Sequence, residues 1–196
     1  MIYAERKCIL MQRKDVFDIA KIGLILFAIT AISAGILAAV NGVTAPIISA
    51  NAKAKREAAM SKVLPDAAAF EKVEYVEPDS SVIEVYDAGD AGCVVLCEPH
   101  GYAGAISIVV GVKPDLTVNS IDITSQSETP GLGANCTNDS FKSAYVGKTK
   151  DIKVVKSNPS GNQIDALSSA TVTTKAVTKG VNDALIAAEE LIGGDK

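Results

Sequence analysis

A run of apolar residues near the N-terminus constrains this chain more than any other feature. Residues 22–40 carry no charged side chain, and the uncharged stretch continues to Ala52. About 20 consecutive apolar residues are needed to cross the hydrocarbon core of a bilayer. The run also exceeds the roughly 7–15 apolar residues of a cleaved signal peptide. We therefore predict a retained transmembrane helix over residues 22–43; a signal peptide and a buried core helix are the alternatives.

The charges beside this run favour one orientation. Basic residues within 1–21 directly precede it: Arg6, Lys7, Arg13, Lys14 and Lys21. The basic residues that follow, the first of them Lys53, lie further from the apolar run. Because positive charge next to a spanning helix is retained on the cytoplasmic side, we expect residues 1–21 in the cytoplasm. The folded domain that follows the helix would then lie on the outer side of the cell (inner) membrane.

A second helical pattern follows the apolar run. Thr44 and Pro46 fit an N-cap followed by an early-helix proline. The Ala- and Lys-rich sequence after them continues to Leu64 and Pro65. We expect a helical stalk over residues 44–65 and a separate folded domain over residues 66–196.

From about Glu71 onwards the apolar residues recur with a period of two, which is typical of strands. The candidate strands are 73–75, 82–86, 93–97, 105–112 and 116–124. The connections between them are short and contain Pro, Gly, Asp or Ser. Such connections are too short for helical crossovers, so the sheet should be mainly antiparallel. The fold class is therefore α+β, with helices flanking the sheet.

Composition excludes several functions. His100 is the only histidine, so sites that need several histidines, or a catalytic triad built on one, are not expected. The net charge is −4 and no basic run lies outside the N-terminus, so we expect no nucleic-acid partner. No Gly-x-Gly-x-x-Gly motif is present to bind a nicotinamide cofactor. We therefore predict no metal site and no histidine-based catalytic residues.

The cysteines give no metal or haem motif. Cys93 and Cys97 are four positions apart on a predicted strand, which separates them by about 13 Å. That distance is too long for a disulfide bond. We expect buried free thiols, and a bridge from Cys136 to either cysteine is the open alternative.

One segment near the C-terminus combines small and hydroxyl side chains. Residues 165–174 read Asp-Ala-Leu-Ser-Ser-Ala-Thr-Val-Thr-Thr. Apolar residues then recur at helical spacing: Val177, Val181, Ala184, Leu185, Ala188 and Leu191. Thr171 should therefore lie at a helix N-terminus, where unpaired N–H groups and the helix dipole suit a phosphate. An ordinary N-cap is the alternative interpretation.

A second segment has loop chemistry. Residues 128–133 read Glu-Thr-Pro-Gly-Leu-Gly. Proline fixes one backbone angle and glycine permits unusual ones, so this sequence predicts a tight loop with exposed N–H groups. A plain surface turn would give the same sequence.

Both segments resemble a known family, the covalent-FMN domain. This domain occurs in the G subunit of Rnf complexes and in the C subunit of sodium-pumping NADH:quinone reductases. The first segment resembles its flavinylation motif, Asp-x-x-(Ser/Thr)-Gly-Ala-Thr: Asp165, Ser168, Ala170 and Thr171 match, and Ser169 replaces the usual glycine. Loop 128–133 is nearly identical to a loop of the domain. Segments 101–112 and 141–148 also resemble it, and the resemblance spans about residues 50–192.

The resemblance implies a covalent flavin. In the family the last threonine of the motif carries FMN through a phosphoester, which corresponds to Thr171. The resemblance assigns further cofactor contacts to Thr129, Gly131, Leu132, Ser168, Ser169, Ala170 and Thr174. A separate flavin transferase, with FAD as donor, would recognise Asp165.

The resemblance also implies a role. The chain would relay electrons within a membrane complex that couples ferredoxin and NAD redox chemistry to Na+ or H+ translocation. Its partners would be the other Rnf-type membrane subunits and the lipid bilayer, and catalysis would belong to the complex. Two alternatives are a flavin carrier for another extracytoplasmic reductase and a membrane-anchored scaffold without flavin.

Overall fold

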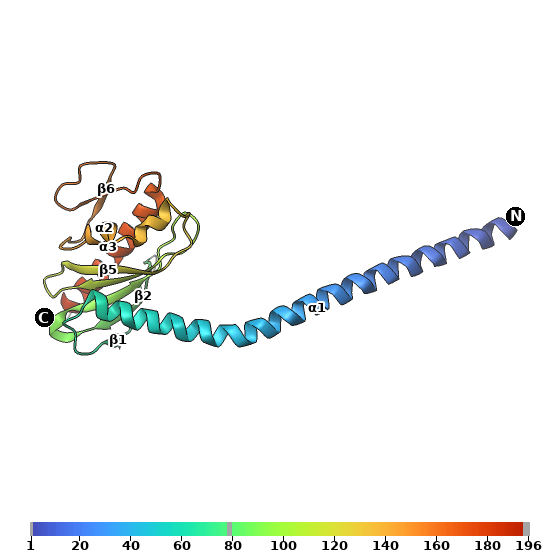
Figure 1. Cartoon of the computed structure of the whole chain (residues 1–196), viewed down its shortest axis with the longest axis horizontal. Helices are drawn as coiled ribbons and strands as arrows, with labels where there is room; N and C mark the ends of the chain where they lie inside the picture. Colours follow the sequence, from blue (N-terminus) through green and yellow to red (C-terminus); the bar gives the residue numbers. More distant parts are fainter. Residues whose placement is uncertain (1, 78–79, 194–196) are drawn as a thin grey trace. The chain divides into compact units, whose positions relative to one another are not determined.

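The structure is a computed structural model that describes residues 2–77 and 80–193, with side chains from Phe17 onwards. The chain divides into two compact units, Met1–Ala52 and Lys53–Lys196. The described part of the first unit is entirely helical and belongs to α1 (Ile2–Val63), the long helix in Figure 1. The second unit holds the last turns of α1 and all the remaining elements.

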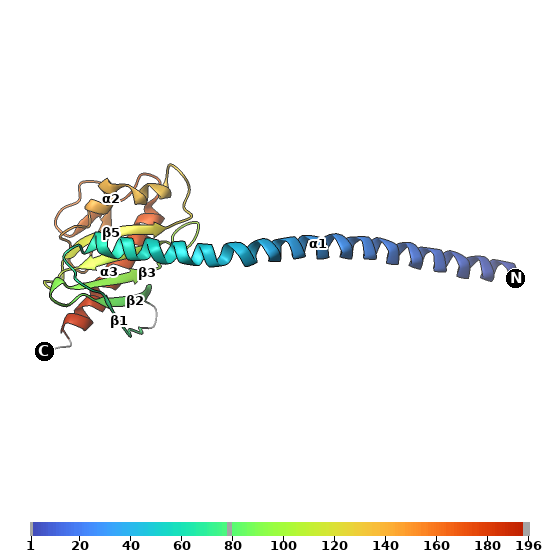
Figure 2. The same cartoon turned by 60° about the horizontal axis from the view of Figure 1, so that its bottom comes forward.

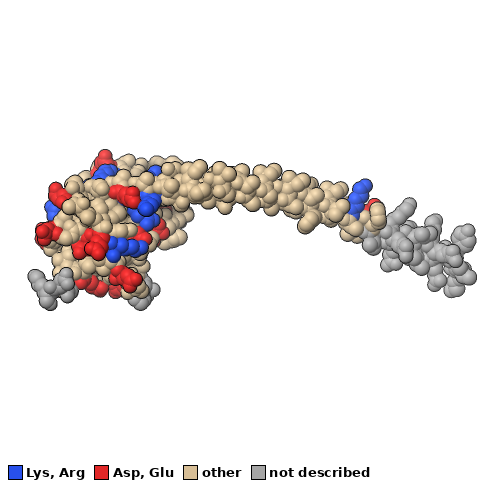
Figure 3. Space-filling view, turned by 90° about the horizontal axis from the view of Figure 1, so that it is seen from below, with Lys and Arg blue, Asp and Glu red and all other residues tan. Residues whose placement is uncertain are grey.

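Within the first unit, α1 is long and apolar enough to cross a membrane. The segment Phe17–Val63 contains a window of mean hydropathy 2.4, none of which is buried by the protein. On the face that Figure 3 shows, charged side chains are missing from a long part of this helix and gather on the second unit. A helix that is apolar and unburied is suited to face lipid.

The predicted helix start at Thr44 is wrong, because α1 continues through this region with Pro46 inside it. The Thr44 hydroxyl donates backwards to the carbonyl of Val40 (2.9 Å) and does not cap a new helix. The Ser49 hydroxyl likewise donates to the carbonyl of Pro46 (2.9 Å). Proline cannot donate a backbone hydrogen bond, yet α1 continues past Pro46 to Val63.

The second unit is built on a five-stranded sheet in the order β1-β2-β3-β4-β5, in which every neighbouring pair is antiparallel. The strands are β1 (Glu71–Val73), β2 (Val82–Asp87), β3 (Cys93–Cys97), β4 (Ser107–Val112) and β5 (Val118–Ser125), and the short helix η1 (Gly89–Ala91) joins β2 to β3. Val95 at the centre lies opposite Val85 on one side and Val110 on the other. This meander confirms the predicted antiparallel sheet.

Helices cover both faces of the sheet, as Figure 2 shows. On β3, Cys93, Val95 and Cys97 belong to the core shared with α3 (Thr171–Gly193). The intervening Val94 and Leu96 pack against Met60 and other residues in the last turns of α1. All five β3 residues are buried, so the strand is covered on both faces and the unit has three layers.

The segment between β5 and α3 carries elements that the sequence pattern did not predict. It contains η2 (Gly133–Thr137), α2 (Asp139–Ser143), β6 (Lys153–Val155) and β7 (Gln163–Asp165), and β6 pairs with β7 in parallel. Tyr145, which follows α2, is fully buried, and its hydroxyl lies 2.9 Å from that of Thr178 on α3. This contact ties the segment to the helix that begins at Thr171.

Cys93, Cys97 and Cys136 are buried free thiols. The expectation of free thiols is therefore confirmed for these three residues, and the alternative of a bridge to Cys136 is wrong. Cys8 lies outside the described side chains.

Candidate functional site

Two segments about 40 positions apart in the sequence meet around one cavity. The cavity has a volume of about 540 Å³. Its lining residues are Tyr102, Glu128, Thr129, Leu132, Gly133, Ser169, Ala170, Thr171, Val172 and Thr173. Loop 128–133 thus faces the second half of the hydroxyl-rich segment, and Tyr102 completes the wall.

Thr171 is the first residue of α3, as the sequence predicted. The backbone enters the helix through a turn in which the Ala170 N–H donates to the Leu167 carbonyl (2.9 Å). Ser169, inside this turn, has a φ of +61°, a left-handed conformation that favours glycine. The first N–H groups of a helix have no partner within it, so those at the start of α3 are available beside the half-buried Thr171.

Thr174 stabilises this turn from inside the helix. It is fully buried, and its hydroxyl donates to the Ala170 carbonyl (3.1 Å) and accepts from the Leu167 N–H (3.0 Å). Its side chain is not among those that line the cavity. The structure thus gives Thr174 a role in shaping the helix start.

A buried carboxylate joins the three walls of the cavity. Glu128 is 5% exposed, and its Oε1 accepts hydrogen bonds from the backbone N–H groups of Tyr102 and Ala103, both at 2.9 Å. Its Oε2 accepts from the hydroxyl of Thr173 at 2.5 Å. One side chain therefore links the turn after β3, loop 128–133 and the N-terminus of α3.

Two glycines permit this close packing around Glu128. A Cβ on Gly133 would lie 2.5 Å from the Glu128 Oε2 and 2.6 Å from the Thr173 hydroxyl. A Cβ on Gly101 would lie 2.5 Å from the Glu128 Oε1. Any larger residue at either position would push the carboxylate away from its donors.

The hydrogen bonds keep this carboxylate ionised. Burial alone would raise the pKa of Glu128. The hydrogen bonds from Thr173, Ala103 and Tyr102, with a smaller contribution from His100, lower this pKa by more than burial raises it. The net pKa therefore lies below the ordinary value. A fixed negative charge is thus part of the cavity wall.

The structure brings together some of the predicted site residues. Thr129, Leu132, Ser169, Ala170 and Thr171 all line the cavity. Gly131 lies in the same loop with a φ of +78°, but it is exposed and does not line the cavity. Its carbonyl accepts a hydrogen bond from the Asn135 side chain (2.9 Å), so its role is to shape the loop.

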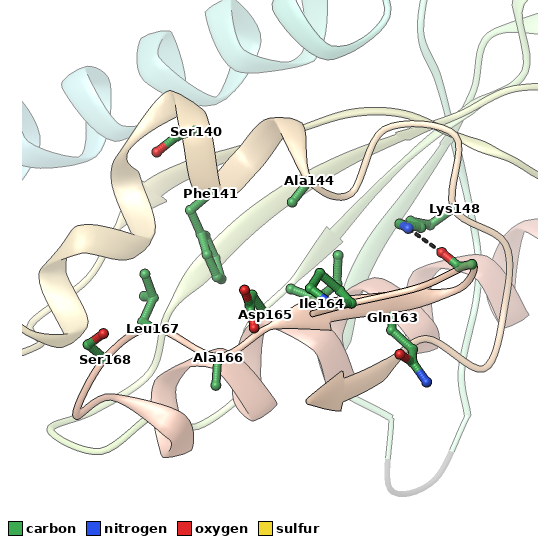
Figure 4. A pocket seen from close by; sticks show the side chains of 12 residues that line it. Ser140, Phe141, Ala144, Lys148, Gln163, Ile164, Asp165, Ala166, Leu167 and Ser168 are labelled. Atoms are coloured by element: carbon green, nitrogen blue, oxygen red, sulfur yellow. Dashed lines mark hydrogen bonds between the residues drawn. The ribbon is translucent and has the colours of Figure 1, made fainter. Parts of the chain in front are cut away.

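Asp165 and Ser168 lie at a second cavity, of about 510 Å³. Figure 4 shows them with Phe141 and Ala144, which lie on and just after α2, and with Lys148, whose ammonium group donates to the carbonyl of Gly161. The first half of the motif therefore lines one cavity and the second half lines the other.

Five residues that line the cavity were not predicted as site residues: Tyr102, Glu128, Gly133, Val172 and Thr173. Glu128 and Gly133 are the ends of the loop that was singled out, and Val172 and Thr173 directly follow Thr171. A carboxylate in a loop that is otherwise small and apolar was the available signal. The hydrogen bond to Thr173 depends on tertiary packing and leaves no local pattern.

The cavity fits a phosphorylated, partly aromatic ligand such as FMN. The start of α3 offers unpaired N–H groups and a hydroxyl to a phosphate. Among the lining residues, Tyr102, Leu132 and Val172 expose 75%, 41% and 53% of their surface, which suits contact with a flat ring. The volume lies within the range of about 300–1,000 Å³ usual for ligand sites. Across residues 17–77 and 80–193, no group of three or more His, Cys, Asp or Glu side chains could hold a metal ion.

Comparison with known families defines the class of this domain. Residues 101–186 match the family described as the FMN-binding domain, and they contain every residue that lines the first cavity. Residues 11–63 match a second family, the RnfG N-terminal region. Together the two matches cover most of α1 and most of the second unit.

Curated relatives narrow the class to one type of protein. The G subunit of the proton-translocating ferredoxin:NAD(+) oxidoreductase complex of Clostridium ljungdahlii is 37% identical over 169 residues, 83% of this chain and 88% of that protein. The G subunit of the Na(+)-translocating complex of Acetobacterium woodii is 35% identical, over 83% of this chain and 87% of its own. The chain therefore belongs to the family of G subunits of Rnf-type, ion-translocating ferredoxin:NAD(+) oxidoreductase complexes. Among solved structures, NqrC of Shewanella oneidensis superposes with a TM-score of 0.49 at 21% identity, over 57% of this chain and 59% of its own.

Proposed function

We propose that this chain is a membrane-anchored electron carrier of an Rnf-type complex, with FMN attached covalently to Thr171. The observation that carries the proposal is the cavity that loop 128–133 and the start of α3 form together, within the matched FMN-binding domain. The names of the relatives support the setting, an ion-translocating ferredoxin:NAD(+) oxidoreductase complex. The other subunits of such a complex are the proposed partners.

Different residues of the cavity hold different parts of the cofactor in this proposal. The hydroxyl of Thr171 is the proposed attachment point, and the N–H groups at the start of α3, with Ser169 and Ala170, bind the phosphate. Thr129 and Leu132 contact the ring. When bound, FMN supplies reversible uptake and release of electrons. Attachment through the phosphate leaves the ring unmodified and prevents loss of the cofactor on the extracytoplasmic side.

Attachment requires a second protein in this proposal. A flavin transferase, with FAD as the donor, recognises Asp165, which is exposed and lies with Ser168 at the second cavity. The transferase can bind there without occupying the space that the ring needs, because the two cavities have no lining residue in common. The apolar part of α1 anchors the chain, with the N-terminus in the cytoplasm and the second unit outside the cell (inner) membrane.

The direct test is the intact mass of the full chain co-produced with a flavin transferase. We expect one added FMN in the wild type and none in Thr171→Ala. Thr149→Ala is the matched control, because Thr149 is an exposed threonine that does not line the cavity. It should keep the full addition. An unmodified wild type, with the transferase shown to be active on another substrate, would contradict the proposal.

The same preparation tests the two alternatives. A scaffold without flavin would be colourless under every condition of production. A carrier for a different reductase would carry flavin but would not co-purify with Rnf-type membrane subunits. Copurification of the flavin-loaded chain with such subunits from its native membrane is the result that the proposal expects.

A further inference from the structure

The strongest unassigned feature of the cavity is the negative charge in its wall. The carboxylate of Glu128 is buried and accepts three hydrogen bonds. It lines the same cavity as Thr171. A charged group that is fixed inside a binding site acts on its ligand more strongly than a solvated one, because water screens it less.

We propose that Glu128 is a positioning and charge-setting residue of the flavin site, which holds the three walls together and lowers the reduction potential of the bound flavin. This inference rests on the proposed function, since it requires flavin in the cavity. Reduction by two electrons with uptake of one proton adds one negative charge to the ring. A carboxylate nearby disfavours that added charge, so it favours the oxidised state.

The hydrogen bond from Thr173 reduces the effective negative charge that Glu128 presents to the cavity. Its hydroxyl is the only side-chain donor to Glu128 within the part of the chain that the structure describes; the other two donors are backbone N–H groups. A hydrogen-bond donor draws charge from the carboxylate and holds it in place. Removing the donor while keeping the carboxylate should therefore change the flavin potential in the direction opposite to removing the charge.

The first variant is Glu128→Gln in the full-length, flavin-loaded chain in detergent. The amide oxygen can still accept from Tyr102 and Ala103, and the amide nitrogen can donate to the Thr173 hydroxyl, so the walls keep their connections. We expect a more positive midpoint potential at pH 8. The equilibrium constant for reduction should rise at least tenfold, which corresponds to a shift of about 30 mV in the midpoint potential of a two-electron couple. An unchanged or more negative potential would overturn the inference.

The matched control is Glu190→Gln. Glu190 lies near the far end of the same helix, α3, 17 residues beyond Thr173 or about 25 Å along the axis. The Glu190→Gln variant removes the same charge without changing the cavity, so the flavin potential should stay at the wild-type value. A shift equal to that of Glu128→Gln would mean that net charge alone matters, and it would overturn the proposed role of Glu128.

Thr173→Val and Thr173→Ser test the same inference independently. They can be measured even if Glu128→Gln does not yield folded protein. Valine has a similar shape but no donor, so the potential should become more negative than in the wild type. Serine restores the donor and should restore the wild-type potential. General damage to the site would not give shifts of opposite sign in Glu128→Gln and Thr173→Val. An unchanged or more positive potential in Thr173→Val would overturn the inference.

The measurements separate this inference from the proposed function. Intact mass and flavin absorbance of the wild type are recorded first. A wild type without flavin contradicts both the proposed function and the inference. A loaded wild type whose potential is unaffected by Glu128→Gln and Thr173→Val overturns the inference alone.

Discussion

The hydroxyl of Thr173 lies 2.5 Å from the Oε2 of Glu128, although 45 positions separate the two residues. This hydrogen bond connects the first turn of α3 to loop 128–133. Because both partners are buried, breaking the bond would leave polar groups without partners, which costs about 1–3 kcal/mol. The bond therefore contributes to the stability of the unit as well as to the shape of the cavity.

Glu128 should make the stability of the folded unit depend on pH. The hydrogen bonds lower its pKa in the folded state below the unfolded value of about 4.3. Its contribution to stability is therefore fully present above that value and is lost as the pH falls through the folded pKa. We expect the free energy of unfolding to fall less steeply between pH 5 and pH 3 in Glu128→Gln than in the wild type, measured by denaturant titration. Equal pH dependence would contradict the assignment.

Ser169→Gly should stabilise the fold. Ser169 has a φ of +61°, which costs an L-residue about 1–2 kcal/mol. Glycine avoids this cost, but ordering its more flexible backbone costs about 0.5–1 kcal/mol. We therefore expect the free energy of unfolding, measured by thermal denaturation, to rise by roughly 0.5–1 kcal/mol. Ser168→Gly is the control, because Ser168 is not among the residues with positive φ. A lower melting temperature for Ser169→Gly would contradict this prediction.

Gly111→Ala should disturb the packing of the last turns of α1 on the sheet. A Cβ on Gly111 would lie 2.5 Å from the carbonyl oxygen of Val63 and 2.9 Å from its carbonyl carbon. Backbone atoms cannot move aside as a flexible side chain can, so we expect a loss of about 1–3 kcal/mol, measured by denaturant unfolding. Gly104→Ala is the matched control, because a Cβ there meets nothing within 4 Å. If the two variants unfold alike, the close contact at Val63 is not a constraint.

The three buried cysteines should be unreactive in the folded protein. Burial raises the pKa of Cys93 to about 12 and that of Cys136 to about 11, and it also raises the pKa of Cys97. Since the thiolate is the reactive form, we expect no alkylation by iodoacetamide at pH 8 in a Cys8→Ser background. After denaturation, mass spectrometry should show three modified cysteines. Labelling of any of them in the folded state would show that the core opens.

Strands β2 to β5 were predictable because their signals are local, whereas β1 (Glu71–Val73) meets the predicted strand 73–75 only at Val73. β3 was predicted with its observed bounds, because five apolar or thiol side chains stand between residues typical of turns. The start of α3 at Thr171 followed from the apolar stripe behind it. β6 and β7 were missed because each has only three residues, too few for a periodic pattern. The predicted helix start at Thr44 was wrong because Pro46 matches the usual first-turn proline of a new helix, whereas in the structure it lies inside the continuous α1.

The site was predictable only in part. The resemblance pointed to both segments, and five of the residues assigned from it, among them Thr171, line one cavity. Thr174 was among the cofactor contacts assigned from the resemblance, but helix geometry turns its side chain inward. Glu128 was missed as a site residue because its importance comes from donors far away in the sequence.

The order of the elements also bears on when the cavity can exist. Its walls come from the turn at Tyr102, from loop 128–133 and from the start of α3, which follows all the described strands in sequence. The sheet needs only sequential neighbours to form, so it can assemble while the chain is still being made. A chain that lacks α3 would therefore have a sheet but not this cavity. The cavity forms only when α3 has docked against the sheet and loop 128–133.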